Sequence, residues 1–190
     1  MEVKEAMTDA RAEVETARLL LRPWTDEYTD DLVRLFRDPR VARNITRRGR
    51  PAKPESARRS SFRAQRLWEE YGFGPWAALD KESRDWIGRI GLTLLEDWPG
   101  PDKWALEGEL HPVFWGRGLA IEGGQAALRF GFDVVELPRI IAVTRPTNVP
   151  ARRAAERCGL RFQGTVNWRD RDFVWYTADR QGIPFLPGLI

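Results

Sequence analysis

The strongest constraint on the fold is the stretch from Trp104 to Val135, where an apolar strand leads into a glycine turn and then into a helix of small residues. We expect the strand to stop at Pro112 and the turn to carry Gly116 and Gly118. A helix start has backbone N–H groups without acceptors and a partial positive charge. A strand, glycine turn and helix in succession therefore form a cradle for an anion such as phosphate, and Arg117 adds a full charge to it.

Two familiar phosphate loops are excluded, because the chain has no Gly-x-x-x-x-Gly-Lys-Ser/Thr and no Gly-x-Gly-x-x-Gly with an acid about 20 residues further on. The string Leu110-His111-Pro112 followed by Trp115-Gly116-Arg117-Gly118-Leu119-Ala120 resembles motif A of the GNAT superfamily of acetyl-CoA-dependent N-acetyltransferases. The usual form of that motif is Gln/Arg-x-x-Gly-x-Gly/Ala, and Trp115 stands where Gln or Arg is commonest. With Glu122 after the loop, this substitution is similar to the branch that acetylates ribosomal-protein N-termini.

The length of 190 residues predicts one domain: a loose leader at 1–16, a single acetyltransferase domain at 17–180 and a tail at 181–190. No apolar run approaches the roughly 18 residues that a membrane helix needs, and Met1–Glu15 has no apolar segment. We therefore expect a cytoplasmic protein without a membrane partner. One cysteine and one histidine exclude an intramolecular disulfide and make a dedicated metal site an unfavoured prediction.

Basic residues are concentrated between Arg37 and Arg66, although the net charge is only +3. The acidic residues in this basic block are Asp38 and Glu55 alone. Such a block can attract an acidic partner or nucleic acid, and it can also be a solvated face of an arginine-rich protein. We favour the solvated face.

The pattern of apolar residues, prolines and glycines predicts an alternation of strands and helices. A helix starts near Asp26 and is ended by Pro39, and Asn44–Pro54 is a loop. A second helix at Glu55–Tyr71 buries Phe62, Leu67 and Trp68 and closes at Gly72. The remaining expected elements are a long helix to Val135, a helix at Asn148–Cys158, and strands at 18–24, 73–80, 86–95, 104–111, 139–144, 160–168 and 172–178.

A helix separates the strands at 104–111 and 139–144, so these two strands should lie parallel in one sheet. The whole order matches the fold that the resemblance implies. This is the GNAT fold, an α/β fold of the α+β type with a mixed, mostly antiparallel sheet of about seven strands, helices on both faces and a parallel, splayed central strand pair.

The resemblance also implies a coenzyme site, with acetyl-CoA as co-substrate and no metal. In the family the pantetheine arm slots between the splayed strands. By position this assigns Leu110 and Val113 to the arm, and Asn148 would approach the arm from the other strand. Asn148 can also start the next helix through an Asx-type turn, and the two roles are compatible. The pyrophosphate would bind Gly116, Arg117, Gly118, Leu119 and Ala120.

Acetyl transfer from a thioester needs a neutral amine and a stabilised oxyanion. An α-amine has a pKa of about 8, so a base or a water chain must remove one proton at neutral pH. Glu107 and Glu109 share one face of the motif strand and are the candidate bases, although both could simply be solvated or ion-paired. Backbone N–H groups near Leu110 suit the oxyanion. We expect a structural role for His111 at the strand end.

The proton donor for the leaving thiolate is not evident from the sequence. Ala151 stands where the ribosomal-protein acetyltransferase branch, which this sequence resembles, usually has Ser. No Tyr lies between Asn148 and Leu160. Tyr176 is expected to be too distant, so acid chemistry would rest on solvent. Cys158 is predicted to pack in the core.

The sequence predicts an N-acetyltransferase that acts by direct transfer on a primary amine, favouring a protein or peptide N-terminus. A small amine, such as a polyamine, an amino acid or an aminoglycoside-like compound, is the alternative acceptor. A different class, a basic RNA- or ribosome-binding module on the same fold, is less favoured. Candidate residues to line the acceptor site are Trp24, Trp76, Trp168 and Trp175, and a homodimer is left open.

Overall fold

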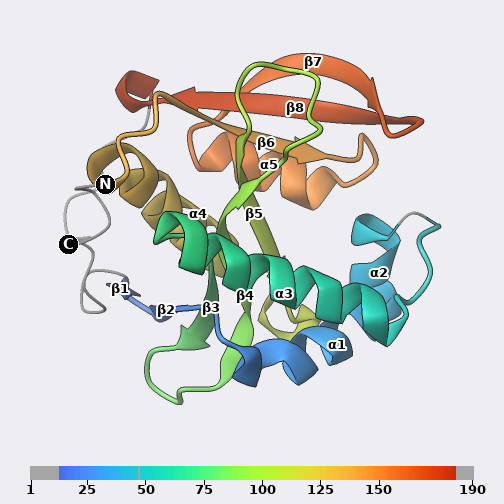
Figure 1. Cartoon of the computed structure of the whole chain (residues 1–190), viewed down its shortest axis with the longest axis vertical. Helices are drawn as coiled ribbons and strands as arrows, with labels where there is room; N and C mark the ends of the chain where they lie inside the picture. Colours follow the sequence, from blue (N-terminus) through green and yellow to red (C-terminus); the bar gives the residue numbers. More distant parts are fainter. Residues whose placement is uncertain (1–12, 47, 183–190) are drawn as a thin grey trace.

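The computed structural model describes residues 13–46 and 48–182, and an eight-stranded sheet in the order β1-β2-β3-β4-β5-β6-β8-β7 forms its centre (Figure 1). Neighbouring strands are antiparallel except β5 and β6, which are parallel. The strands are β1 (Val14–Glu15), β2 (Leu19–Pro23), β3 (Pro75–Asp80), β4 (Trp86–Leu94), β5 (Trp104–Leu110), β6 (Arg139–Thr144), β7 (Arg161–Trp168) and β8 (Arg171–Asp179). The α-helices are α1 (Thr29–Arg37), α2 (Pro39–Ile45), α3 (Pro54–Tyr71), α4 (Leu119–Arg129) and α5 (Val149–Arg157).

The predicted mixed, mostly antiparallel sheet with one parallel pair is confirmed, and it has one strand more than expected. Val14–Glu15 lie in the predicted leader but form β1, which pairs Val14 with Leu21 of β2. Without β1, the outer edge of β2 would present a row of unpaired backbone groups. The end of the predicted leader therefore belongs to the sheet.

The helix α2 was not predicted, because Pro39 was expected only to end a helix and it also begins one. The predicted loop Asn44–Pro54 is therefore wrong at Asn44 and Ile45, which belong to α2, and at Pro54, which begins α3. Asp38 caps α2 by accepting a hydrogen bond from the Arg40 backbone N–H at 2.8 Å. Proline is favoured at the first helical position, where its missing N–H has no intrahelical acceptor. Arg145 then ties α2 to the segment after β6, donating to the backbone oxygens of Arg43 and Thr46.

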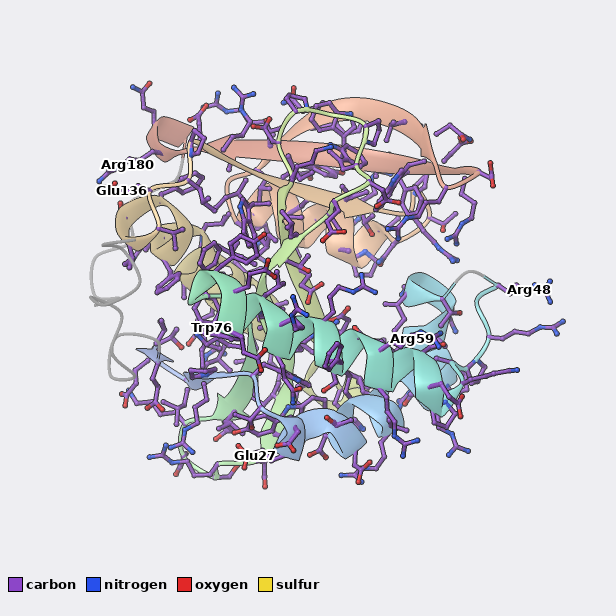
Figure 2. The ribbon with its side chains drawn as sticks, in the orientation of Figure 1. Glu27, Arg48, Arg59, Trp76, Glu136 and Arg180 are labelled. Carbon is purple, nitrogen blue, oxygen red and sulfur yellow. The ribbon has the colours of Figure 1, made fainter. Side chains whose placement is uncertain are left out.

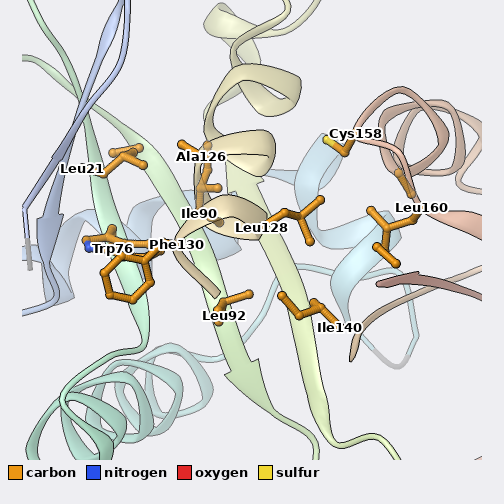
Figure 3. Close-up of a cluster of buried hydrophobic side chains, with 14 of the residues drawn as sticks. Leu21, Trp76, Ile90, Leu92, Ala126, Leu128, Phe130, Ile140, Cys158 and Leu160 are labelled. Atoms are coloured by element: carbon orange, nitrogen blue, oxygen red, sulfur yellow. The ribbon is translucent and has the colours of Figure 1, made fainter. Parts of the chain in front are cut away.

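The two faces of the sheet bury separate hydrophobic clusters, as the alternation along β2 illustrates. Leu19 and Leu21 pack with α4 and α5, whereas Leu20 packs with α1 and α3. Figure 3 shows the first cluster, with Trp76, Ile90 and Phe130 among the buried side chains between α4 and the sheet. The predicted arrangement of helices on both faces is confirmed.

Small residues let α4 approach the sheet closely. A Cβ built on Gly123 would lie 2.6 Å from Ile90 Cδ1, far inside normal contact distance. After Arg129 the helix continues as a π-helix, η4 (Phe130–Val134). The predicted helix to Val135 therefore consists of an α-helical part followed by a π-helical part. No helix in the described part of the chain is both long and apolar enough to cross a membrane.

Two burial predictions need correction. Phe62 is 62% exposed, because the buried stripe of α3 runs through its small residues and Leu67. Trp24 and Trp76 are only 2% and 0% exposed, so both belong to the core and do not line an acceptor site. Large aromatic side chains contribute more by burial than by forming an open wall.

Candidate active site

The parallel strands β5 and β6 separate almost as soon as they meet. Their one paired register position is Ala105 with Ile141, near the start of β5. Beyond it, residues 106–110 have no partner on β6, while β5 stays paired to β4 as far as Leu110. The predicted splay of the central pair is thus present, and it leaves one edge of β5 open.

The open edge of β5 presents backbone hydrogen-bond donors. The His111 N–H donates to Ile87 O at 2.8 Å, which sets the alternation of the ladder with β4. Because alternate residues of an antiparallel strand bond to the same neighbour, the N–H groups of Gly108 and Leu110 point away from β4. Fixed donors at this position can stabilise negative charge that develops during a reaction.

The glycine turn after β5 leaves a run of backbone N–H groups free. The first amides of α4 with an acceptor belong to Ile121 and Glu122, which both bond to Gly118 O at 3.1 Å. The N–H groups of Gly116, Arg117, Gly118, Leu119 and Ala120 have no hydrogen bond to any described residue. Their convergence at the positive end of α4 is the predicted anion cradle.

Gly116 and Gly118 are required by backbone conformation rather than by crowding inside the protein. Their φ angles are +76° and +79°, values that favour glycine. A Cβ on Gly116 would meet nothing within 4 Å, and one on Gly118 would meet only Arg18 Nη2 at 3.6 Å. The space in front of both glycines is therefore open to an external ligand.

Glu122 fixes the start of α4 to the N-terminal strands. This role is additional to the favourable interaction of an acidic side chain with the first turn of a helix. Glu122 accepts hydrogen bonds from Thr16 Oγ1 at 2.6 Å and from the Arg18 backbone at 2.7 Å. Arg18 also bonds the backbone oxygen of Arg117 at 2.8 Å, within the cradle. Partial burial would raise the pKa of Glu122, but these hydrogen bonds outweigh it and hold the pKa below its usual value.

Of the residues assigned to the pantetheine arm, Leu110 is buried and Val113 is 55% exposed in the turn η3 (Pro112–Phe114). Trp115 bonds this turn to the strand, since its indole Nε1 donates to Leu110 O at 2.8 Å. The Arg117 guanidinium lies over the Phe114 ring, 5.4 Å from its centroid. The structure thus gathers Leu110 and Val113 beside the cradle.

Asn148 uses both ends of its side chain within the protein. Its amide oxygen accepts from the Ala151 N–H at 3.4 Å, and its Nδ2 donates to Thr144 Oγ1 at 3.1 Å. The Asx-type helix start at α5 is therefore present. Contact with a pantetheine arm stays a prediction.

On the opposite face of β5, a buried cluster of charges joins the two predicted bases. Arg89 on β4 is 3% exposed and bonds Glu109 twice, through Nε at 3.1 Å and through Nη2 at 3.2 Å. The same Nε lies 3.2 Å from Glu107 Oε1, but the geometry is not that of a hydrogen bond, and this buried oxygen has no hydrogen-bond partner among the described residues. Both carboxylates are thus ion-paired with Arg89, but Glu109 also accepts its hydrogen bonds, whereas Glu107 Oε1 accepts none from a described residue.

Burial is the main influence on Glu107 and raises the pKa of its carboxyl to about 7. The charge of Arg89 lowers this pKa, while that of Glu109 raises it. A carboxylate with a pKa near neutrality can take a proton from an ammonium group and return it to solvent. The structure thus distinguishes two carboxylates that the sequence treated as equivalent.

The remaining candidates are engaged in structural contacts. His111 caps the η3 turn through a long contact of 3.5 Å from the Val113 N–H to Nδ1. Tyr176 is fully buried on β8, where its hydroxyl accepts from Arg152 Nε at 3.2 Å. Cys158 is also buried, and burial raises the pKa of its thiol to about 12, which supports the predicted packing role.

Sequence reasoning missed Arg89, the residue that differentiates the two carboxylates. The available signal was a lone arginine in the otherwise apolar run Trp86–Leu94. Its pairing with Glu109 depends on the register between β4 and β5, which is a tertiary property. Among residues 13–46 and 48–182, no group of three or more His, Cys, Asp or Glu side chains is arranged to hold a metal ion.

Comparison with known proteins gives a consistent result. The profile described as "Acetyltransferase (GNAT) domain" matches residues 18–161. The FsC-acetyl coenzyme A-N(2)-transacetylase of Aspergillus fumigatus is 27% identical over 157 residues, covering 80% of this chain and 66% of that relative. The chain thus spans slightly less than two thirds of that relative's length.

Solved structures share the fold. A GnaT-family acetyltransferase from Bordetella pertussis aligns with a TM-score of 0.74 and 25% identity, covering 88% of this chain and 99% of that one. RimL, a ribosomal-protein α-N-acetyltransferase solved with coenzyme A, aligns with a TM-score of 0.70 and 14% identity over 88% of this chain and 97% of its own. Because the family profile matches from β2 through the cradle to α5, this chain belongs to the GNAT acetyltransferase family.

Proposed function

We propose that this protein transfers an acetyl group from acetyl-CoA directly to a primary amine, and that the amine is a protein or peptide N-terminus. One observation carries the proposal: the anion cradle and the half-buried carboxylate Glu107 lie on opposite sides of a single strand whose edge is open. The donor and the acceptor could thus reach the same backbone from two sides.

The free amides at the start of α4 fit a pyrophosphate, and the open space before Gly116 and Gly118 fits close approach by a ligand. The open edge of β5 fits an arm that carries amide groups, because backbone donors there have no strand partner. RimL, which shares the fold, was solved with coenzyme A. These features support acetyl-CoA as the co-substrate.

Acetyl-CoA supplies the acetyl group as a thioester. Glu107 takes one proton from the acceptor ammonium, so that the neutral nitrogen can form the new N–C bond as the C–S bond breaks. The N–H groups of Gly108 and Leu110 face the developing oxyanion. Ala151 has no hydroxyl, so the leaving thiolate takes its proton from solvent, and the nitrogen releases its second proton to solvent as the amide forms.

A small-molecule amine is the second candidate acceptor. The Aspergillus relative, which is named for transfer between acetyl coenzyme A and FsC, favours it. The two candidates differ in what the acceptor site must hold: a polypeptide needs an extended groove, while a small amine needs a closed pocket.

Thermal melting followed by an acceptor screen tests the proposal. Acetyl-CoA should raise the melting temperature, because a ligand that binds only the native state stabilises it, by about 2.7 kcal/mol at 100 times Kd. Labelled acetyl-CoA is then offered with N-terminal peptides, amino acids, polyamines and aminoglycosides. Transfer to none of these amines, with no shift in melting, would refute the function.

A further inference from the structure

An open groove of about 350 Å³ runs along the exposed side of α3. The helix contributes Arg59, Phe62, Arg63 and Arg66, and the end of β4 and the segment after it contribute Leu94 and Glu96. The four α3 residues fall at spacings of three and four, which place them on one helix face. Figure 2 shows Arg59 on α3, while Arg48 lies at the periphery of the molecule.

Helix α3, which lines the groove, is also connected to the proposed base by polar contacts. Ser60, next to Arg59 in the chain, accepts a hydrogen bond from Arg89 Nη1 at 3.0 Å, and Arg89 in turn contacts Glu107. Arg63 lies one helical turn beyond Ser60, and its charge lowers the pKa of Glu107. Arg63 therefore belongs both to the groove and to the surroundings of Glu107.

The positive charge in the groove is only partly neutralised. Arg66 pairs with Glu70 at 3.4 Å, and Arg59 donates to Ser56 Oγ at 3.3 Å, a neutral partner. Arg63 is exposed and makes no hydrogen bond or ion pair with a described residue. Phe62 lies between these arginines with 62% of its surface exposed. The groove thus offers guanidinium groups and an apolar ring side by side.

We propose that this groove binds an acidic polypeptide segment and delivers the amine at its N-terminus to Glu107. The inference rests on the proposed acetyl transfer and narrows its acceptor. Guanidinium groups bind carboxylates through paired hydrogen bonds, and Phe62 can hold an apolar side chain between them. A polyamine or an aminoglycoside, both polycations, would be repelled by Arg59 and Arg63.

Charge also separates a peptide from nucleic acid at this site. Glu70 and Glu96 line the same groove, and their carboxylates would face any continuous phosphate backbone laid along it. Nucleic-acid binding depends on neutralising many phosphates in succession. A peptide with acidic residues at intervals avoids these two carboxylates.

The test uses three peptides with the same N-terminal residue and length, in which the following residues are acidic, amide-substituted or basic. The kcat/KM for the acidic peptide should exceed that for the neutral one by about 10-fold at low salt, and the basic peptide should be the poorest. The ratio should shrink as salt rises above about 0.1 M, where the screening length is about 10 Å. Equal kcat/KM for all three peptides would overturn the inference.

Substitutions of the groove arginines test whether the preference for the acidic peptide arises in the groove. Arg63→Gln and Arg59→Gln should each lower the acidic-to-neutral ratio about threefold, and Arg63→Lys should restore most of it. Taking the ratio cancels any change in the ionisation of Glu107. The matched control is Arg58→Gln, because Arg58 is exposed on the same helix but does not line the groove. An equal loss in Arg58→Gln would show general surface charge and overturn the inference.

Two other outcomes separate the inference from the proposed function. Efficient transfer to neutral peptides without preference for acid refutes the groove's role and leaves the acetyltransferase in place. Salt-sensitive binding of RNA that competes with the acidic peptide and is lost in Arg63→Gln assigns the groove to nucleic acid. Absence of transfer to any amine refutes the proposed function itself.

Discussion

The two sides of β5 use different chemical groups. On the α4 side, the cradle consists of backbone N–H groups held by glycine conformations and by the helix start. On the α3 side, the candidate chemistry depends on ionised side chains from three segments, namely Glu107, Arg89 and Arg63. A site of backbone N–H groups can be encoded by one continuous stretch of sequence. A site of paired side chains exists only after distant segments pack together.

The largest effect is expected from a substitution that disrupts the anion cradle. Gly118→Glu places a side chain at φ +79° and a negative charge in the open space before the cradle. Acetyl-CoA should then give no rise in melting temperature, because the cradle would repel the pyrophosphate. Gly49→Glu, at φ +66° in the loop before α3, introduces the same backbone strain and charge away from the cradle. Its response to acetyl-CoA should match the parent, and an unchanged response of Gly118→Glu would refute the cradle.

The second largest effect is expected from Glu107→Gln, which tests whether the Glu107 carboxylate is the base. An amide cannot take the proton, so kcat/KM should fall by about 10²- to 10⁴-fold near neutral pH. The parent rate should rise with pH through about 7, where the carboxylate ionises, and this limb should be missing in the variant. A pH profile of the same shape in both proteins would assign the proton transfer to water.

The same substitution has a signature in stability. The folded-state pKa of Glu107 is raised from 4.5 to about 7, so between these values the native protein holds a proton that the unfolded chain has released. The stabilisation from this group is thus present at low pH and lost as pH rises through 7. As the pH rises from 5 to 8, the free energy of unfolding of Glu107→Gln, measured in urea, should increase by about 2 kcal/mol relative to that of the parent. One pKa unit corresponds to about 1.4 kcal/mol. No relative gain would mean that Glu107 is not buried as a near-neutral acid.

Glu109→Gln sharpens the contrast between the two carboxylates. It removes the hydrogen-bonded carboxylate of Arg89, which is only 3% exposed, and leaves Glu107 as its one remaining ion-pair partner among the described residues. Loss of one partner from a buried charge cluster should cost up to about 3 kcal/mol. Unfolding should show this loss, while the rise of rate with pH should persist in the folded fraction. Glu82→Gln, in the exposed turn between β3 and β4, is the control and should leave stability unchanged. Loss of the pH limb in Glu109→Gln would reverse the assignment of the base.

The smallest effect concerns Asn148, which caps the start of α5. Asn148→Ala removes the cap of α5 and should cost about 1 kcal/mol of stability. The affinity for acetyl-CoA, measured by calorimetry, should change less than threefold if capping is its whole role. A tenfold loss of affinity would instead show that Asn148 contacts the coenzyme. Asn148→Ser, which can still cap, should then keep the stability but not the affinity.

Much of the fold could be predicted from local patterns. The strands β3 to β8 and the helices α3 and α5 lie within a few residues of their expected positions, because apolar periodicity and glycine or proline at the ends define such elements. The α2 helix was missed because Pro39 can end one helix or begin another. The short strand β1 was missed because two residues carry no periodicity.

Neighbouring residues of the sequence determined the anion cradle, because they encode the backbone conformation at Gly116 and Gly118 and the helix start. The splayed strand pair was expected from the resemblance to the GNAT fold. Only the tertiary structure decided which glutamate accepts hydrogen bonds from Arg89 and which keeps an oxygen without a hydrogen-bond partner among the described residues, because that depends on the register of β4 against β5 and on burial. Likewise, it placed Arg59, Arg63 and Arg66, which are exposed as expected of a solvated face, along one open groove. Local conformation is a property of adjacent residues, whereas the pKa and pairing of a side chain depend on residues that only folding brings near.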